Sequence, residues 1–144
     1  MADIVTSQLL ENSNSRWVMK LTSFSDGTGE SAVAKVNATA TGPLGVTIQG
    51  NTVYPGTHLV VTGIWYDIHG LGLRLLWEAT ANVDMLVLSD GHHDWPGRTN
   101  YGVFRGFVNP KTAGATGSIL FTTSGQVAGS SYTVILEGLK GIQG

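Results

Sequence analysis

Short apolar runs alternate with polar turns along the whole chain, and this rhythm predicts an all-β fold. Between residues 16 and 22, for example, Trp17, Met19 and Leu21 alternate with a second set of side chains that faces the other way. This period of two is typical of a strand with one buried face. The pattern predicts about nine strands and no amphipathic helix.

The longest apolar stretch runs from Leu59 to Trp77. Apolar side chains on both faces of residues 59–68 predict a central strand that is covered on both sides. Two long runs joined by a turn at His69-Gly70 predict a hairpin. The residues expected in the core of this hairpin are Trp65, Leu73, Leu75 and Trp77.

The other predicted strands are shorter. They cover residues 32–36, 45–49, 84–89, 101–108, 119–121 and 132–139, with a polar loop from Ser89 to Asn100. Residues 1–10 form either an N-terminal arm or an edge strand. Strands at this spacing predict a single β-sandwich domain over residues 1–144, with a jelly-roll-like topology preferred over a barrel.

Composition and charge exclude several classes of function. The 144 residues include no Cys, so thiol catalysis, thiolate metal sites and disulfides are excluded. The net charge is −2 and the eight basic residues are scattered, so we expect no nucleic-acid partner. We find neither a signal peptide nor an apolar run long enough to span a membrane, and therefore expect no membrane association. Only 12% of the residues are charged, which indicates a surface that neighbouring molecules partly cover.

One cluster, His92-His93-Asp94, has the chemistry of a metal site. Adjacent residues of a strand point to opposite faces, so a third ligand would have to come from His58, His69 or a distant carboxylate. The alternative is an exposed polar loop tip, which we prefer. No Gly-x-Ser-x-Gly motif or phosphate-binding glycine motif is present. We therefore expect no catalytic residues, no cofactor and no metal, with a cupin-like metalloenzyme as the least favoured hypothesis.

Trp95 lies in a predicted loop with turn-forming neighbours. A loop Trp beside Arg98 and Tyr101 suits a protein-contact hot spot, a sugar-stacking platform, or a ring folded back over the end of the sandwich. A strand or arm at the N-terminus offers backbone groups for strand addition. The predicted protein-contact residues are therefore Ile4, Val5, Leu9, His92, His93, Trp95, Arg98 and Tyr101.

Several phrases of the sequence resemble small virion proteins of tailed bacteriophages, of the cyanophage or marine phage type. The phrases are RWVMK (16–20), SDGTGE (25–30), AKVNA (34–38), IWYDI (64–68), LLWEAT (75–80), GATGSILFTT (114–123) and YTVILE (132–137). The resemblance implies a capsid decoration, or cement, protein that binds the major capsid protein lattice as a homo-oligomer, expected to be a trimer. It implies a place in the virion after assembly in the host cytoplasm, and it transfers no catalytic residue.

A second function class stays open. A tail- or neck-associated module that binds carbohydrate or a receptor would need several coplanar exposed aromatic side chains. Only Trp95 and Tyr101 suit that role in the sequence. The sequence does not distinguish between the capsid shell, the neck and the tail as the place of the protein.

Overall fold

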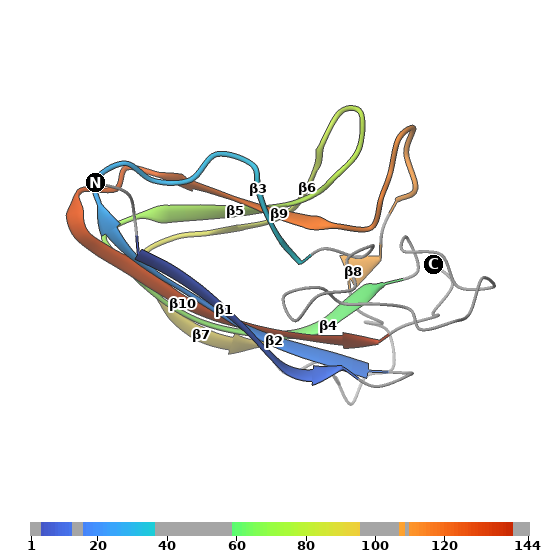
Figure 1. Ribbon diagram of the computed structural model, residues 1–144, viewed down its shortest axis with the longest axis horizontal. Helices are drawn as coiled ribbons and strands as arrows, with labels where there is room; N and C mark the ends of the chain where they lie inside the picture. The colour runs from blue at the N-terminus through green and yellow to red at the C-terminus, as the bar shows by residue number, and fades with distance from the viewer. Residues whose placement is uncertain (1–3, 13–15, 37–58, 96–106, 109, 140–144) are drawn as a thin grey trace.

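The computed structural model describes residues 4–12, 16–36, 59–95, 107–108 and 110–139. Within these residues the chain forms ten strands and no helix, arranged as two antiparallel sheets that pack face to face (Figure 1). The all-β sandwich expected from the alternating pattern is confirmed.

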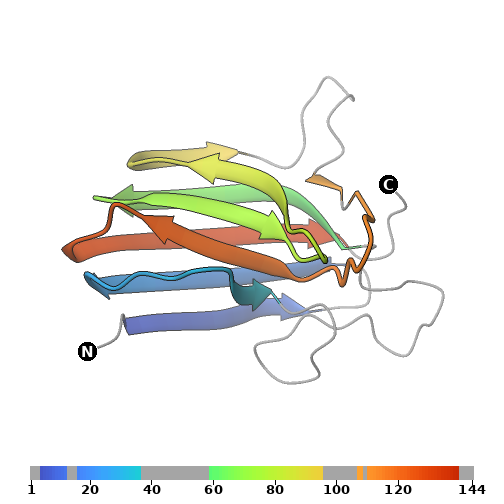
Figure 2. The same cartoon turned by 90° about the horizontal axis from the view of Figure 1, so that it is seen from above.

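The larger sheet has the strand order β1-β2-β10-β4-β7, and β8 also pairs with β4. Its strands are β1 (Ile4–Asn12), β2 (Arg16–Asp26), β10 (Ala128–Leu139), β4 (Val60–His69), β7 (Gly91–Trp95) and β8 (Phe107–Val108). The smaller sheet has the order β3-β9-β5-β6. Its strands are β3 (Val33–Val36), β9 (Ile119–Ser124), β5 (Gly72–Trp77) and β6 (Val83–Leu88). Figure 2 shows β1 along one edge of the larger sheet and β7 along the other.

The hydrophobic core lies between the two sheets and takes every second side chain of their long strands. Trp17, Met19 and Leu21 of β2 are fully buried, as the period of two predicted. From the smaller sheet Leu73, Leu75 and Trp77 face them, each at most 3% exposed. Further members of the same cluster are Val61, Ile64, Ile68, Ile119, Phe121, Tyr132, Val134 and Leu136.

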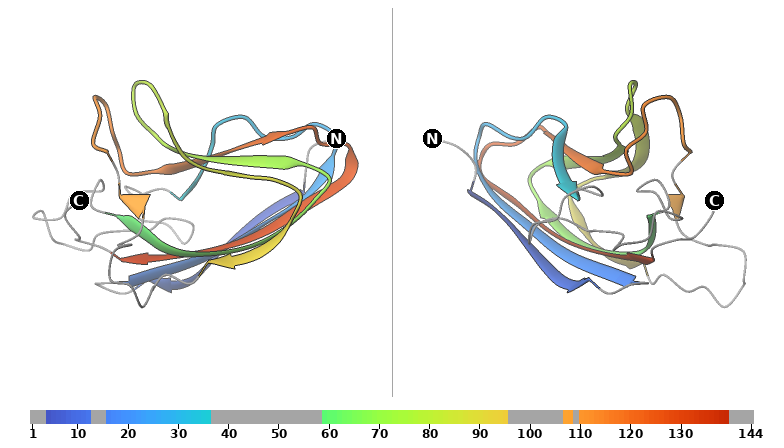
Figure 3. Two further views of the ribbon diagram at one scale, coloured as in Figure 1. Left: turned by 180° about the vertical axis from the view of Figure 1, so that it is seen from behind. Right: turned by 45° about the vertical axis from the view of Figure 1, so that its right-hand side comes forward.

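Four connections cross between the sheets at one end of the sandwich. They join β2 to β3, β4 to β5, β6 to β7 and β9 to β10. Figure 3 shows the layers joined at this end and further apart at the other. Side chains tie the connections together, because Gln126 Nε2 donates to the Thr28 carbonyl at 3.0 Å and Ser130 Oγ donates to the Gly70 carbonyl at 2.9 Å. Gly70 adopts a φ of 78°, which a residue with a Cβ rarely does.

The predicted hairpin of residues 59–77 is wrong. β4 pairs with β10, β7 and β8, whereas β5 pairs with β6 and β9 in the other sheet. The turn at Gly70-Leu71 therefore carries the chain from one sheet to the other. A two-residue connection between two apolar strands has the same sequence pattern in both arrangements, so periodicity alone did not separate them.

The expected burial of Trp65 is also wrong, and the expected cover on both faces of β4 holds at the start of the strand, where Val60 is 1% exposed, but not at Trp65. Gly138 lies opposite Val61 and Glu137 lies opposite Gly63, so Thr62 is an extra residue in β4. This bulge reverses the alternation. Before the bulge the odd-numbered residues of this segment face the core, and after it the even-numbered residues do. Trp65 therefore faces outward, with 39% of its surface exposed.

The predicted loop from Ser89 to Asn100 is wrong for its first half. Residues 91–95 form β7 and pair with β4 in the register Asp67↔His92 and Ile64↔Trp95. The polar composition of this short edge strand concealed it. Of the predicted strand 101–108, residues 107–108 form β8, and residues 101–106 and the predicted strand 45–49 lie outside the described residues.

Candidate interaction surface

The outer face of the larger sheet carries exposed apolar side chains that the core does not use. Ile4 of β1 and Phe24 of β2 lie directly opposite each other and are 68% and 58% exposed. Trp65 of β4 lies opposite Ile135 of β10 on the same face. Exposed aromatic and branched side chains of this size are typical of contact surfaces.

Polar side chains separate and frame these apolar groups. Thr6, Thr22 and Thr133 occupy matching positions on three neighbouring strands, and the hydroxyls of Thr6 and Thr22 are hydrogen-bonded. At the other end of the face Arg16 bridges Glu11 at 3.4 Å and Glu137 at 2.8 Å. The three charged side chains are each between about a third and a half exposed, so this network contributes little to stability.

The edge of the larger sheet at β1 is the second part of the candidate surface. In the described part of the chain β1 pairs with β2 alone, through residues Ile4 to Asn12. Val5 and Leu10 are 43% and 48% exposed. No other described strand pairs with the far side of β1, whose backbone groups can therefore accept an added strand.

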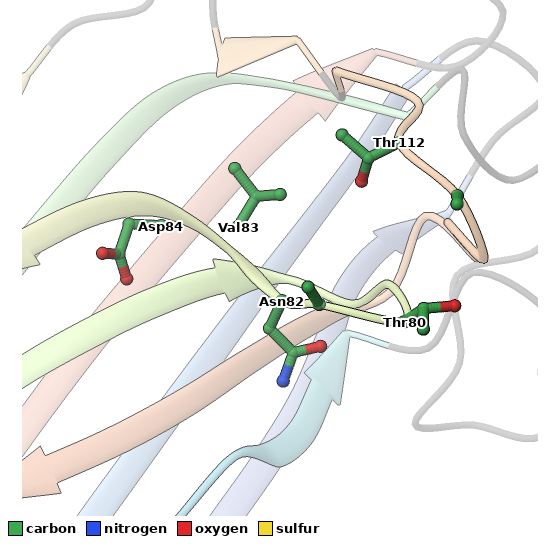
Figure 4. Close-up of a pocket in the computed structure, with 7 residues that line it drawn as sticks. Thr80, Asn82, Val83, Asp84 and Thr112 are labelled. Atoms are coloured by element: carbon green, nitrogen blue, oxygen red, sulfur yellow. The ribbon is translucent and has the colours of Figure 1, made fainter.

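An open hollow of about 570 Å³ lies at the end of the sandwich opposite the crossing connections. Figure 4 shows the polar side chains that line it: Thr80 and Asn82 come from the β5–β6 connection, Asp84 from the start of β6 and Thr112 from the segment before β9. Two of these groups already have protein partners. Asn82 Oδ1 accepts the Ala79 N–H at 3.1 Å, and Asp84 Oδ1 accepts from Arg74 at 2.6 Å.

A buried polar network joins the β2–β3 connection to both sheets, and sequence reasoning missed it. The Glu30 carboxylate forms an ion pair with the Lys35 ammonium and accepts a hydrogen bond from the Tyr132 hydroxyl at 2.5 Å. The Lys35 and Glu30 side chains are 5% and 6% exposed. Lys35 is the extra residue of a bulge in β3, and such bulges re-aim a side chain. The network is closed to solvent and binds the molecule's own elements together.

The predicted contact residues divide between two distant edges. Ile4 and Val5 are exposed on β1, whereas Leu9 packs against the core. His92, His93 and Trp95 lie in β7. Three strands separate β1 from β7, so these segments lie roughly 20 Å apart and do not form one surface. His92 is exposed, and the side chains of His93 and Trp95, together with Arg98 and Tyr101, lie outside what the structure describes.

The metal hypothesis gains no geometric support from the described residues. His69 Nε2 lies 2.9 Å from Asp67 Oδ1 on the outer face, and His92 is the cross-strand neighbour of Asp67. Among the residues that the structure describes, no three His, Asp or Glu side chains are grouped closely enough to hold a metal ion. The described segments also include no helix with the length and apolarity that a membrane span requires.

Comparison of the chain with protein-family models, with curated proteins and with solved structures gives no match.

Proposed function

We propose that this protein is a non-enzymatic structural component of a phage particle, a capsid decoration protein that binds the head shell and other copies of itself. The observation that carries the proposal is the exposed apolar group on the outer face and edge of the larger sheet, with Ile4, Phe24 and Trp65 as its largest members. Exposed apolar groups that gather on one face and edge of a sheet often mark a surface that another protein covers, and this supports the assembly role. The sequence resemblance to phage virion proteins supports the same role.

We also infer that the sandwich is a jelly roll. The pairs β2/β10, β3/β9 and β5/β6 are nested around one another in sequence, with β4/β7 lying between the second and the third. Eight strands nested in this way, four in each sheet, support a double-sheet jelly roll, with β1 and β8 as additions to the larger sheet. Viral capsid domains and lectins are among the proteins that use this fold.

The second candidate function is a tail- or neck-associated module that binds a carbohydrate or a receptor. The hollow between the β5–β6 region and the segment before β9 favours it, because residues with hydroxyl, amide and carboxylate side chains are among those that line it. Against it, the seven residues that line the hollow include no aromatic side chain, and sugar sites commonly use one as a stacking surface. We therefore rank this function below the decoration role.

Two measurements separate the candidates. Immunogold labelling followed by electron cryomicroscopy of tailed phage particles that carry the protein would give its place, and native mass spectrometry would give its oligomeric state. Label distributed over the head shell, with the trimer implied by the resemblance or another defined oligomer, would support the decoration role. Label confined to the tail or neck, with retention on a glycan array that Asn82→Ala abolishes, would replace it with the second candidate.

A further inference from the structure

The four edges of the two sheets differ in how well they are protected from pairing with another strand. β3 has four residues and contains the bulge at Lys35, and β7 has five residues, three of which are His or Asp. β6 contains a bulge, and the exposed ion pair of Arg74 and Asp84 lies on its side of the sheet. Short strands, bulges and charges are the usual means by which proteins block edge pairing.

Over its first six residues, Ile4 to Leu9, the described part of β1 has none of these protections. Residues Ile4 to Leu10 include no charged residue and no proline, and the bulge comes only at the end of this stretch, with Leu10 as its extra residue. Ile4, Val5 and Leu10 are between 43% and 68% exposed. An exposed, uncharged edge of this length is a template for another strand.

The residues of this edge are arranged symmetrically about Ser7. The sequence IVTSQLL has two apolar residues, three polar residues and two apolar residues. If a second copy of β1 runs antiparallel about a twofold axis at Ser7, each apolar residue meets an apolar residue. The resulting pairs are Ser7 with Ser7, Thr6 with Gln8, Val5 with Leu9, and Ile4 with Leu10 of the second copy.

We propose that β1 of one molecule pairs with β1 of a second copy in this antiparallel register, so that two larger sheets become one continuous sheet. The proposal rests on the assembly role proposed above and names the partner. The other edge of the larger sheet is the alternative partner, but β7 runs in the same direction as β1. A head-to-tail contact that continued the sheet would therefore be parallel, and would close only if the rotation between copies generated a ring, whereas the twofold pair is antiparallel and closes on itself.

The interface is small, because it joins two edges of seven residues. Stable dimers bury more surface than two such edges provide, so we expect a weak dimer in dilute solution. Molecules held on a particle surface have a high effective concentration, which strengthens a weak contact. The β1 contact would then link neighbouring decoration proteins rather than hold a dimer together in solution.

A cysteine at the symmetry centre tests the register. Residues directly opposite in an antiparallel pair have Cα atoms about 4.5–5.5 Å apart, which is within the range of a disulfide. The chain has no Cys, so Ser7→Cys introduces the sole thiol. Under mild oxidation we expect most of this variant to form a disulfide-linked dimer. Ser89→Cys is the matched control, because Ser89 is exposed in the β6–β7 connection, and we expect little dimer from it.

A charge on the edge tests the contact without a covalent bond. Ile4→Lys places an ammonium opposite Leu10 of the second copy, and the dimer contains this change twice. We expect a dimer dissociation constant raised at least about tenfold in sedimentation equilibrium, since two apolar contacts are lost. Val87→Lys is the matched control, because Val87 lies on the edge strand β6 and is 67% exposed, against 68% for Ile4. We expect this control to leave the constant unchanged.

The outcomes separate this inference from the proposed function. Cross-linking by Ser7→Cys, together with a raised dimer dissociation constant of Ile4→Lys in solution, would support the β1 pair. A protein that binds heads or forms oligomers while Ser7→Cys does not cross-link and Ile4→Lys has no effect would overturn the β1 pair and leave the decoration role standing. A protein that stays monomeric and binds no head would overturn both. Circular dichroism of each variant would verify that the β-sandwich is retained.

Discussion

Trp17 and Trp65 lie on opposite faces of the same sheet, and their environments differ completely. Trp17 of β2 faces the smaller sheet and is fully buried, whereas Trp65 of β4 faces outward and is 39% exposed. Both residues belong to strands in which apolar side chains recur at every second position. The covered face holds the fold together, and the uncovered face keeps a large apolar group available for contact.

Two ion pairs show the same difference in burial between the interior and the exterior of the molecule. The side chains of Lys35 and Glu30 are 5% and 6% exposed, whereas those of Arg74 and Asp84 are 47% and 53% exposed. A buried pair that loses one partner leaves an uncompensated charge, while an exposed partner is solvated by water. The following substitutions test whether interior and exterior differ as the geometry implies.

Trp17→Ala should have the largest effect on stability. The variant removes a fully buried indole ring from the centre of the core, and we expect a loss of about 3–5 kcal/mol in the free energy of unfolding. Urea denaturation followed by circular dichroism measures this loss. A change below about 1 kcal/mol would mean that Trp17 is not in a packed core.

Lys35→Met should cause the second largest loss in the free energy of unfolding. In this variant the Glu30 carboxylate would stay buried with only the Tyr132 hydroxyl as a side-chain partner. We expect a loss of about 3 kcal/mol, at the lower end of the range for broken buried pairs. The matched control Arg74→Met breaks an exposed pair and should cost less than about 1 kcal/mol. Adding Glu30→Gln to Lys35→Met should restore part of the stability. Equal losses in the two single variants would contradict the assignment of Lys35 to the interior.

Gly138→Ala should destabilise the protein by about 1–3 kcal/mol through overpacking. A Cβ at this position would collide with the Val60 carbonyl oxygen and the Trp17 ring, neither of which has room to move. Gly63→Ala is the control, since the three atoms nearest to its Cβ would all belong to the side chain of Glu137 on the outer face. That side chain is 37% exposed and has room to turn away, so thermal unfolding of the control should stay close to that of the native protein.

Trp65→Ala should have the smallest effect on folding. We expect a loss of less than about 1 kcal/mol, because the ring is not part of the core between the sheets. If the outer face is a contact surface, the same variant should weaken binding to phage heads in a co-sedimentation assay. A loss of several kcal/mol with unchanged head binding would make Trp65 a structural residue.

Part of this fold could be predicted from the sequence, because alternation reports which side chains share a face. It placed Trp17, Met19 and Leu21 in the core correctly. It failed at β4, where the bulge at Thr62 reverses the alternation and leaves no mark in the pattern of apolar residues. It failed again at Gly70, because a short turn between two apolar strands is the same in sequence whether the strands pair or cross between sheets.

The candidate surface was predictable only in part, because the sequence does not report which strands lie side by side. Ile4 and Val5 stood out as apolar residues near the N-terminus, and the structure leaves both exposed. The Glu30–Lys35–Tyr132 network was not predictable, because its members are far apart in the chain and one of them is aimed inward by a bulge. Which residues lie opposite one another depends on strand register, and one sequence does not determine it.

Amide hydrogen exchange of β1 at increasing protein concentration tests most directly whether this edge is a contact surface. The β1 amides directed away from β2 have no partner strand among the described residues of one molecule, so they should exchange quickly in dilute solution. At high concentration, or on phage heads, pairing with a second copy should slow their exchange, while the amides of β6 should not change. Exchange at β1 that is equally fast at every concentration and on heads would contradict the account.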